Sequence, residues 1–292
     1  MKMPPANLNV AIHKPPKSYV LAQPCVPQAL DISAQLLQGL QVAEQSLTDL
    51  AVTEASQVKR MIAHLASLSP EQQGLHVRVA ALRHSLGKNS ISRCYADEQG
   101  IPWRWDLERR VLDQTCESLL HSLVQPNADA FIREILAISA LVKGMPSTTF
   151  RTSGVRLAGD KGGWCWQFPD SQGITSCLTA LHEALFQTRF ENGIVEATIA
   201  YGILNWMHPF GDGNGRTSRI VFNAILRRAG MPKGQYIPIK EINYLAHGGH
   251  EVRLRYTVAT GDWEELLEYF VNVLDFCKVV LHQEVTAADC RA

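Results

Sequence analysis

Two apolar stretches joined by a short, glycine-rich loop constrain this chain more than any other feature. The loop occupies residues 208–219 and reads HPFGDGNGRTSR. Isoleucine, valine, leucine, alanine and aromatic residues dominate both 194–206 and 220–226, which predicts two largely buried helices. Pro209 disfavours the helical conformation at His208, so the first helix should end there. The sequence therefore predicts a tight loop between two core helices.

The loop combines features that suit the binding of phosphate groups. Gly213 and Gly215 allow the backbone to approach a ligand closely. The loop leads into a helix N-terminus, where free N–H groups and the helix dipole favour an anion. Arg216 and Arg219 are three residues apart, so both side chains lie on one face of the first turn. These features predict a site that holds successive phosphates.

Two further loop side chains indicate catalysis. Asp212 offers the hard oxygen ligand that Mg²⁺ takes beside a nucleotide phosphate. His208, with an ordinary pKa of about 6.5, could accept a proton near neutral pH. Anion site, metal ligand and general base together describe a phosphate-transfer site. A P-loop is excluded because no lysine follows the glycines, and a calcium loop because Arg216 stands where an oxygen ligand belongs.

The loop resembles the signature of the Fic (Fido) family, H-x-F-x-D/E-G-N-G-R-x-x-R, at every defined position. A weaker resemblance covers residues 130–275. It implies a mostly helical fold that transfers AMP from Mg·ATP to a Ser, Thr or Tyr hydroxyl of a target protein. It also implies that His208 deprotonates the acceptor hydroxyl and that Asp212 holds the Mg²⁺. The residues implied to bind the nucleotide are Gly211, Gly213, Asn214, Gly215, Arg216 and Arg219.

Other functions remain open within this resemblance. Gly215 favours adenylyl transfer, because the Doc-like kinase branch of the family carries a lysine there. Transfer of UMP, phosphate or phosphocholine is an alternative, since no base-contacting residue is assigned within 241–255. A non-catalytic interaction module with the same fold is a third hypothesis, against which the intact histidine and arginines of the loop count.

A β-hairpin is predicted upstream of the loop. Residues 150–157 and 164–168 have strand character, and a glycine-rich turn at 159–163 separates them. A lone hairpin needs a surface on which to pack. By resemblance, residues 155–168 form a flap beside the catalytic loop that docks the target chain by adding a strand.

The remaining sequence predicts helices, including 128–143, 174–186 and one that opens near Trp105. The expected fold is all-α, with a Fic core, one β-hairpin flap and an N-terminal helical region. The expected organisation is an extended, proline-rich arm at 1–27, the N-terminal helical region at 28–126, the Fic core at 127–281 and a C-terminal tail at 282–292.

Composition argues against several classes of protein. The chain has 28 basic and 28 acidic residues, which predicts neither a nucleic-acid nor a membrane partner. It has no signal-peptide core and no run of the ~20 apolar residues needed to span a bilayer. Its seven cysteines form no C-x-x-C pair, and free thiols fit the cytoplasm. The expected location is the cytoplasm, with delivery as a secreted effector left open.

The sequence lacks the inhibitory motif that many members of the Fic family carry. Many members of the Fic family carry an inhibitory helix with the motif Ser/Thr-x-x-x-Glu-Gly/Asn. The glutamate of this motif pairs with the second arginine of the signature and blocks productive binding of ATP. No stretch of this chain matches, and the nearest N-terminal candidate, residues 55–60, has Lys59 in place of the glutamate. We therefore expect Arg219 to be free to hold the γ-phosphate. The protein should then be active alone or be held off by a separate antitoxin-like inhibitor.

Overall fold

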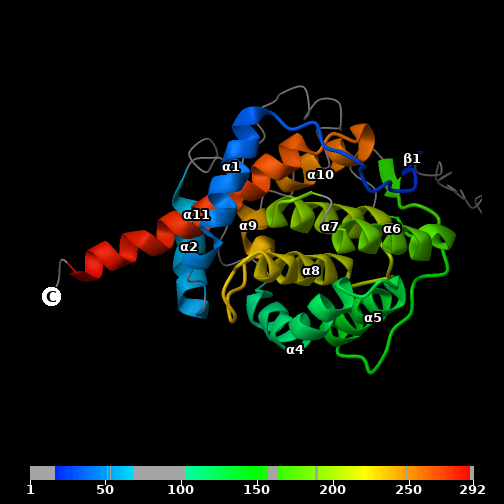
Figure 1. Cartoon of the computed structure of the whole chain (residues 1–292), viewed down its shortest axis with the longest axis horizontal. Helices are drawn as coiled ribbons and strands as arrows, with labels where there is room; N and C mark the ends of the chain where they lie inside the picture. The colour runs from blue at the N-terminus through cyan, green and yellow to red at the C-terminus, as the bar shows by residue number, and fades with distance from the viewer. Residues whose placement is uncertain are drawn as a thin grey trace, which may run out of the picture.

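The computed structural model shows a helical protein with one small sheet (Figure 1). It describes residues 17–50, 52, 54–68, 103–156, 164–187, 190–246 and 249–289. The elements in chain order are β1 (Lys17–Val20), α1 (Ala34–Gln45), α2 (Ala55–Ser67), α4 (Trp105–Leu123), α5 (Ala128–Lys143), β2 (Trp164–Gln167), α6 (Ile174–Phe186), α7 (Gly193–Met207), α8 (Asn214–Arg228), α9 (Ile239–Leu245), α10 (Gly249–Thr260) and α11 (Glu264–Asp289).

Helices α7 and α8 lie side by side at the centre of the molecule (Figure 1). Every residue of α7 except Asn205 is buried, as expected of a helix that is apolar on all faces. Helices α4 and α5 pack on α8, whereas α1, α6 and α11 pack on α7. Burial of each large apolar side chain stabilises the fold by about 1.5–3 kcal/mol, so this pair anchors the loop between them.

Several predicted helices are confirmed at their predicted boundaries. Helices α5 and α6 span the residues expected, and α4 begins at Trp105. The N-terminal helical region expected at 28–126 includes two helices, α1 and α2, separated by a 3-10 turn at Leu47–Asp49. This break turns Leu50 and Val52 into the core.

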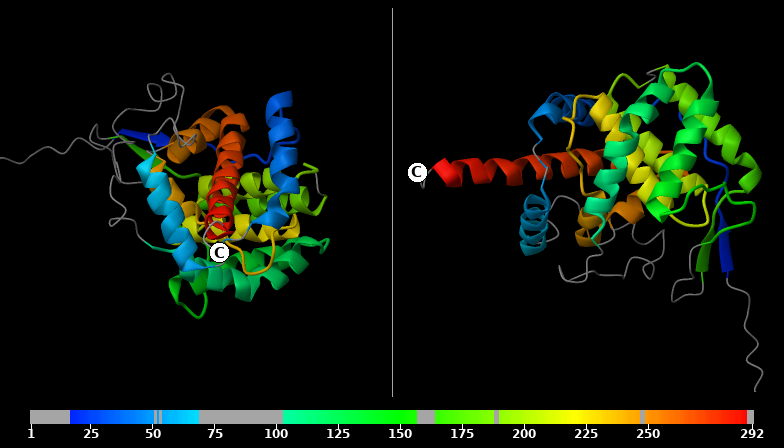
Figure 2. Two further views of the ribbon diagram at one scale, coloured as in Figure 1. Left: turned by 90° about the vertical axis from the view of Figure 1, so that its left-hand side faces the viewer. Right: turned by 90° about the horizontal axis from the view of Figure 1, so that it is seen from below.

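The N-terminal arm contributes a strand that the sequence did not predict. Strand β1 pairs in parallel with β2, with Val20 opposite Gln167. The Leu21 N–H donates to the Gln167 carbonyl at 2.9 Å, and the Trp206 indole N–H donates to the Ala22 carbonyl at 2.9 Å. Residues 17–22 are thereby fixed on the flap (Figure 2).

The arms of the predicted hairpin meet at its base. Arg156 and Gln167 form an antiparallel bridge, and the Phe168 N–H donates to the Val155 carbonyl at 2.9 Å. The turn at 157–163 lies outside the described residues. Strand β2 therefore has the first hairpin arm along one edge and β1 along the other at this point.

Helix α11 begins against the core and its C-terminal part projects away from the other helices (Figures 1 and 2). The Asp262 carboxylate caps its start by accepting from the Glu264 N–H at 2.9 Å. Neither α11 nor any other helix in the described part of the chain has the length and apolar character required to cross a membrane.

Candidate active site

The part of the signature loop that precedes α8, residues 208–213, begins and ends with residues in the left-handed conformation. His208 caps α7 with φ 50° and ψ 59°, and its N–H donates to the Leu204 carbonyl. Pro209 prevents a further helical turn, so the imidazole leaves the helix at a fixed angle. Gly213 precedes α8 with φ 87°, and a Cβ added there would lie 3.4 Å from Val142 Cγ2. Glycine suits this position because it adopts positive φ without strain.

The side chain of Asn214 holds the loop together. Its Oδ1 accepts from the Phe210 N–H at 2.8 Å, and its Nδ2 donates to the Phe210 carbonyl at 2.8 Å. Phe210 itself is fully buried and packs against the Phe150 ring. The amide of Asn214 is therefore used within the loop, and the N–H groups of the first turn of α8 are among the donors that can bind an anion.

His208 is a neutral base with one nitrogen available. Its Nδ1 lies 3.3 Å from the Asn205 carbonyl, which can only accept, so Nδ1 carries the proton and Nε2 carries the lone pair. The pKa of His208 is lowered to about 4, chiefly by burial and also by the nearby Arg151 charge, against the opposing effects of the Asn205 carbonyl and Asp212. The imidazole is therefore unprotonated at neutral pH.

Asp212 and Arg216 form an ion pair at the mouth of the site. Arg216 Nη2 donates to Asp212 Oδ2 at 2.7 Å, and Nη1 donates to the Val142 carbonyl at 2.6 Å. Burial opposes ionisation of Asp212, but the Gly213 N–H and the Arg216 charge outweigh it and lower the pKa. The Asp212 side chain is 79% exposed, so its ionised oxygens can reach a ligand in solution.

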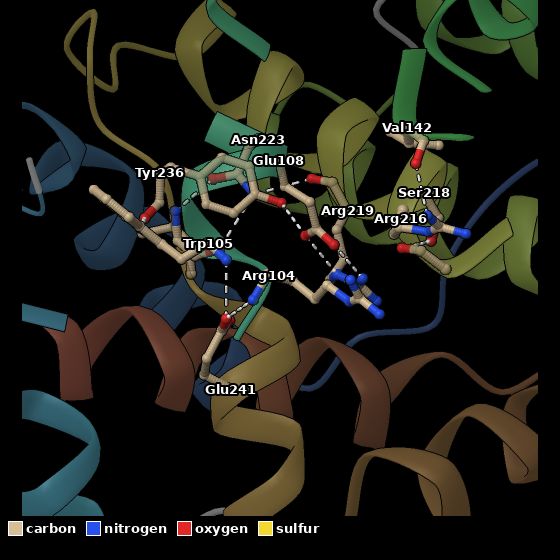
Figure 3. Close-up of polar contacts among 12 residues, drawn as sticks. Arg104, Trp105, Glu108, Val142, Arg216, Ser218, Arg219, Asn223, Tyr236 and Glu241 are labelled. Atoms are coloured by element: carbon tan, nitrogen blue, oxygen red, sulfur yellow. Dashed lines mark hydrogen bonds and ion pairs between the residues drawn. The ribbon is translucent and has the colours of Figure 1, made fainter. Parts of the chain in front are cut away.

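The expectation that Arg219 is unpaired is wrong. Arg219 Nε donates to Glu108 Oε2 at 2.9 Å, and Nη2 donates to Oε1 (Figure 3). Tyr236 adds a third hydrogen bond to Glu108 at 2.7 Å. The sequence search missed this pair because the glutamate comes from α4 and belongs to no motif. The Lys59 ammonium does not take part in this pair and lies 5.7 Å from the centre of the Trp103 ring. The presence of a separate inhibitor remains a prediction.

Every residue predicted to form the site lines one cavity of about 360 Å³. Three lining residues, Arg104, Lys240 and Tyr244, were not assigned from the sequence. The full lining comprises Arg104, His208, Gly211, Asp212, Gly213, Asn214, Gly215, Arg216, Arg219, Lys240 and Tyr244. Four of these side chains are basic and one is acidic, a balance that suits a polyanionic ligand.

Helix α9 supplies the wall opposite the loop. The Lys240 ammonium lies 4.3 Å from the centre of the Tyr244 ring. The pKa of Lys240 is lowered to about 8, chiefly by burial and also by the neighbouring Arg219 charge. Two other polar residues of this region bond to tyrosines instead: Asn243 accepts from the Tyr269 hydroxyl at 2.5 Å, and His250 lies 2.8 Å from the Tyr201 hydroxyl. A lone lysine carried no sequence signal for this position.

Arg151 joins the flap to the catalytic loop. It is buried, and its guanidinium donates to the carbonyls of His208 at 2.7 Å, Met207 at 3.1 Å and Pro169 at 2.5 Å. The backbone N–H of Arg151 donates to the Pro209 carbonyl at 2.9 Å. The sequence placed Arg151 only in a strand-like segment. In the structure it satisfies the last carbonyls of α7 and stabilises the left-handed His208.

The residues present fit a Mg²⁺ ion only together with a nucleotide. The described residues contain no cluster of three or more His, Cys, Asp or Glu side chains that could hold a metal alone. Asp212 is the single carboxylate among the residues that line the cavity. Mg²⁺ is commonly bound by one or two carboxylates with water and substrate phosphates completing the shell. This donor set therefore suits Mg·ATP rather than a free-standing metal site.

A helical fold that gathers a base, a carboxylate and basic side chains at a helix N-terminus is suited to binding phosphate groups. Residues 132–226 match the model of the Fic/DOC family. Together with the intact signature loop, this match identifies residues 132–226 as a segment of the Fic/DOC family type.

Curated relatives and a solved structure agree with this assignment. "Protein adenylyltransferase Fic" of Aedes aegypti is 31% identical over 128 residues, covering 41% of this chain and 24% of the relative. The protein of the same name from Drosophila willistoni is 24% identical over 244 residues, covering 74% and 47%. The chain thus spans less than half of either relative. A Fic family protein from Desulfovibrio desulfuricans G20 has a similar fold, with a TM-score of 0.51, 16% identity and coverage of 88% of this chain and 76% of that one.

Proposed function

We propose that this protein transfers AMP from Mg·ATP to a hydroxyl side chain of a target protein. The observation that carries the proposal is the shared cavity, in which the His208 imidazole, the N-terminus of α8 and two arginines converge. The names of the relatives, protein adenylyltransferases, support the same reaction. Eight of the eleven residues that line the cavity lie in the segment that matches the family model, and Arg104, Lys240 and Tyr244 lie outside it.

Each side chain then has a defined task. His208 Nε2 takes the proton of the acceptor hydroxyl as its oxygen bonds to the α-phosphorus. The bond from that phosphorus to the pyrophosphate oxygen breaks, and the α8 N-terminus, Arg216 and Arg219 stabilise the negative charge that leaves. A Mg²⁺ held by Asp212 and the phosphates would neutralise part of this charge.

The target chain is expected to dock on the flap. The peptide group between Gln167 and Phe168 bonds to Val155 on one side and to Leu21 on the other. Both edges of β2 are therefore used at this point by the protein itself. We propose that a target segment that adds a strand here takes the place of β1.

Intact-mass spectrometry tests the proposed reaction. The purified protein is incubated with Mg·ATP, alone and with cell extract containing α-labelled ATP, beside the His208→Ala variant. Addition of AMP to the parent or to an extract protein is expected, and His208→Ala should reduce it by about 10²–10⁴-fold. UMP, phosphate and phosphocholine give different mass increments. Absence of label from parent and variant alike would contradict the proposal.

A further inference from the structure

We propose that Glu108 is a positioning residue for Arg219, which it holds from behind so that one end of the guanidinium faces the phosphates. The inference rests on the proposed nucleotide transfer and adds a residue from outside the signature loop. It also assigns a direction to the effect of Glu108: its removal should weaken nucleotide binding rather than release an inhibited enzyme.

The first support is the fixed setting of Glu108. Its side chain is fully buried, in the first turn of α4, and α4 packs along α8. Both carboxylate oxygens are used: Oε1 and Oε2 accept from Arg219, and Oε2 also accepts from the Tyr236 hydroxyl at 2.7 Å. Tyr236 is fully buried as well. A carboxylate with these partners cannot move without leaving charges buried and unpaired, which is costly.

The second support is the orientation of Arg219. Its Nε and Nη2 face Glu108, whereas Nη1 lies 3.1 Å from the position of a Cβ built on Gly215 (Figure 3). Arg219 lines the cavity with Gly215, and Glu108 is not among the described residues that do so. The carboxylate therefore stands behind the guanidinium, and Nη1 is the donor turned toward the loop.

The third support is the frame around the start of α4. Glu241 of α9 accepts from the N–H groups of Arg104 at 2.8 Å and Trp105 at 2.9 Å. The Trp105 indole N–H donates to the Tyr236 carbonyl at 3.1 Å. These bonds fix the start of α4 one turn before Glu108, and one of the residues they hold, Arg104, lines the cavity. A guanidinium held in this way is preorganised, so less rotamer freedom is lost when phosphate binds.

An inhibitory carboxylate would need a different geometry. To compete with the nucleotide it would occupy the space of the phosphates, and it would sit on an element that can withdraw. Glu108 lies outside the cavity lining and on a helix packed against α5 and α8. The geometry thus favours a supporting role for the ion pair.

The test compares ATP affinity and transfer kinetics in Glu108→Gln, Tyr236→Phe and the parent. Glu108→Gln should weaken ATP binding and lower kcat/KM for ATP by about 10²-fold, the loss typical of a misplaced binding group. Tyr236→Phe removes one hydrogen bond and should lower both by less. KM for the acceptor should not change in either variant. Equal or higher activity and ATP affinity in Glu108→Gln would overturn the proposal.

A double-mutant cycle separates positioning from simple damage to the fold. If Glu108 acts through Arg219, adding Glu108→Gln to the Arg219→Gln variant should not lower ATP affinity any further. Additive losses would contradict the proposal. Tyr236→Phe decides the matter if Glu108→Gln does not fold, as judged by its thermal melt. ATP binding is measured without an acceptor, so a parent that binds ATP but transfers nothing would refute the proposed function while the inference is still tested.

Discussion

The Phe168 ring lies flat against the His208 imidazole, with ring centres 3.8 Å apart and planes 10° apart. Phe168 is the last residue of the flap, and His208 caps α7. Arg151 bonds to the His208 carbonyl from the start of the same hairpin segment. The flap therefore sets the surroundings of the proposed general base, because it removes water from one face of the ring.

The first prediction concerns the acidic limit of activity. Because burial lowers the pKa of His208 to about 4, kcat/KM should fall below about pH 4 rather than below the ordinary value of about 6.5. The pKa of His208 is lower in the folded than in the unfolded chain, so protonation of His208 opposes folding. The contribution of the neutral imidazole to the free energy of unfolding is therefore complete above about pH 6.5 and is lost as the pH falls toward 4. A pH–rate profile of the parent checks the prediction, and an acidic limb between pH 6 and 7 would disagree with it.

The second prediction concerns the cause of that shift. Phe168→Ala should admit water to the imidazole and raise its pKa toward about 6.5, so the acidic limb moves to higher pH. Phe168→Leu should keep most of the shift, because it keeps an apolar cover. NMR titration of the His208 ring measures the pKa directly. Phe186→Ala, an exposed aromatic on α6, is the control and should leave this titration unchanged.

Local signals in the sequence accounted for the helical core and the loop. The apolar pattern of 128–143 predicted α5, and Gly144 ends it in the left-handed conformation. Pro209 and the glycines of 211–215 marked the loop, because their backbone preferences act over a few residues. The loop residues are close neighbours in the sequence, so the turn itself brings their side chains together.

Contacts between distant segments could not be predicted in this way. The ion pair of Arg219 with Glu108 joins residues 111 positions apart, and a glutamate on a helix usually lies in solvent. Lys240 reaches the cavity only because α9 packs beside it. The pairing of β1 with β2 joins the N-terminal arm to the flap, and a proline-rich arm carries no signal for a parallel partner.

The third prediction assigns Lys240 to nucleotide binding. Its ammonium should contact the phosphates, so Lys240→Gln should weaken ATP binding about tenfold or more, since a hydrogen bond to a charged group contributes about 1.5–3 kcal/mol. With a pKa lowered to about 8, Lys240 loses its charge above that pH, and ATP affinity of the parent should fall there. Lys240→Arg should retain affinity at pH 9. Titration calorimetry across pH checks this; identical profiles for all three proteins would remove Lys240 from the site.

The fourth prediction concerns Asp212 and the metal. Asp212→Asn should raise the Mg²⁺ concentration needed for half-maximal transfer, because a neutral amide is a weaker ligand than a carboxylate. The change also removes the ion pair with Arg216. Asp113→Asn is the control, since Asp113 pairs with Arg109 on α4 and with Arg227 on α8 and is not among the residues that line the cavity. Transfer is measured over a Mg²⁺ series, and an unaltered response in Asp212→Asn would exclude it as a metal ligand.

The last prediction separates stability from function in the loop. Asn214→Ala leaves the N–H and carbonyl of the buried Phe210 without their partners at 2.8 Å, at a cost of about 1–3 kcal/mol for each unsatisfied group. The loop should then lose its shape, and transfer should fall together with the free energy of unfolding. Asn127→Ala removes the N-cap of α5 and should cost about 1 kcal/mol without loss of transfer. Urea denaturation and transfer rates are measured on both variants. If Asn127→Ala lowers transfer as much as Asn214→Ala does, stability alone explains the loss, and Asn214 has no special role in holding the loop for catalysis.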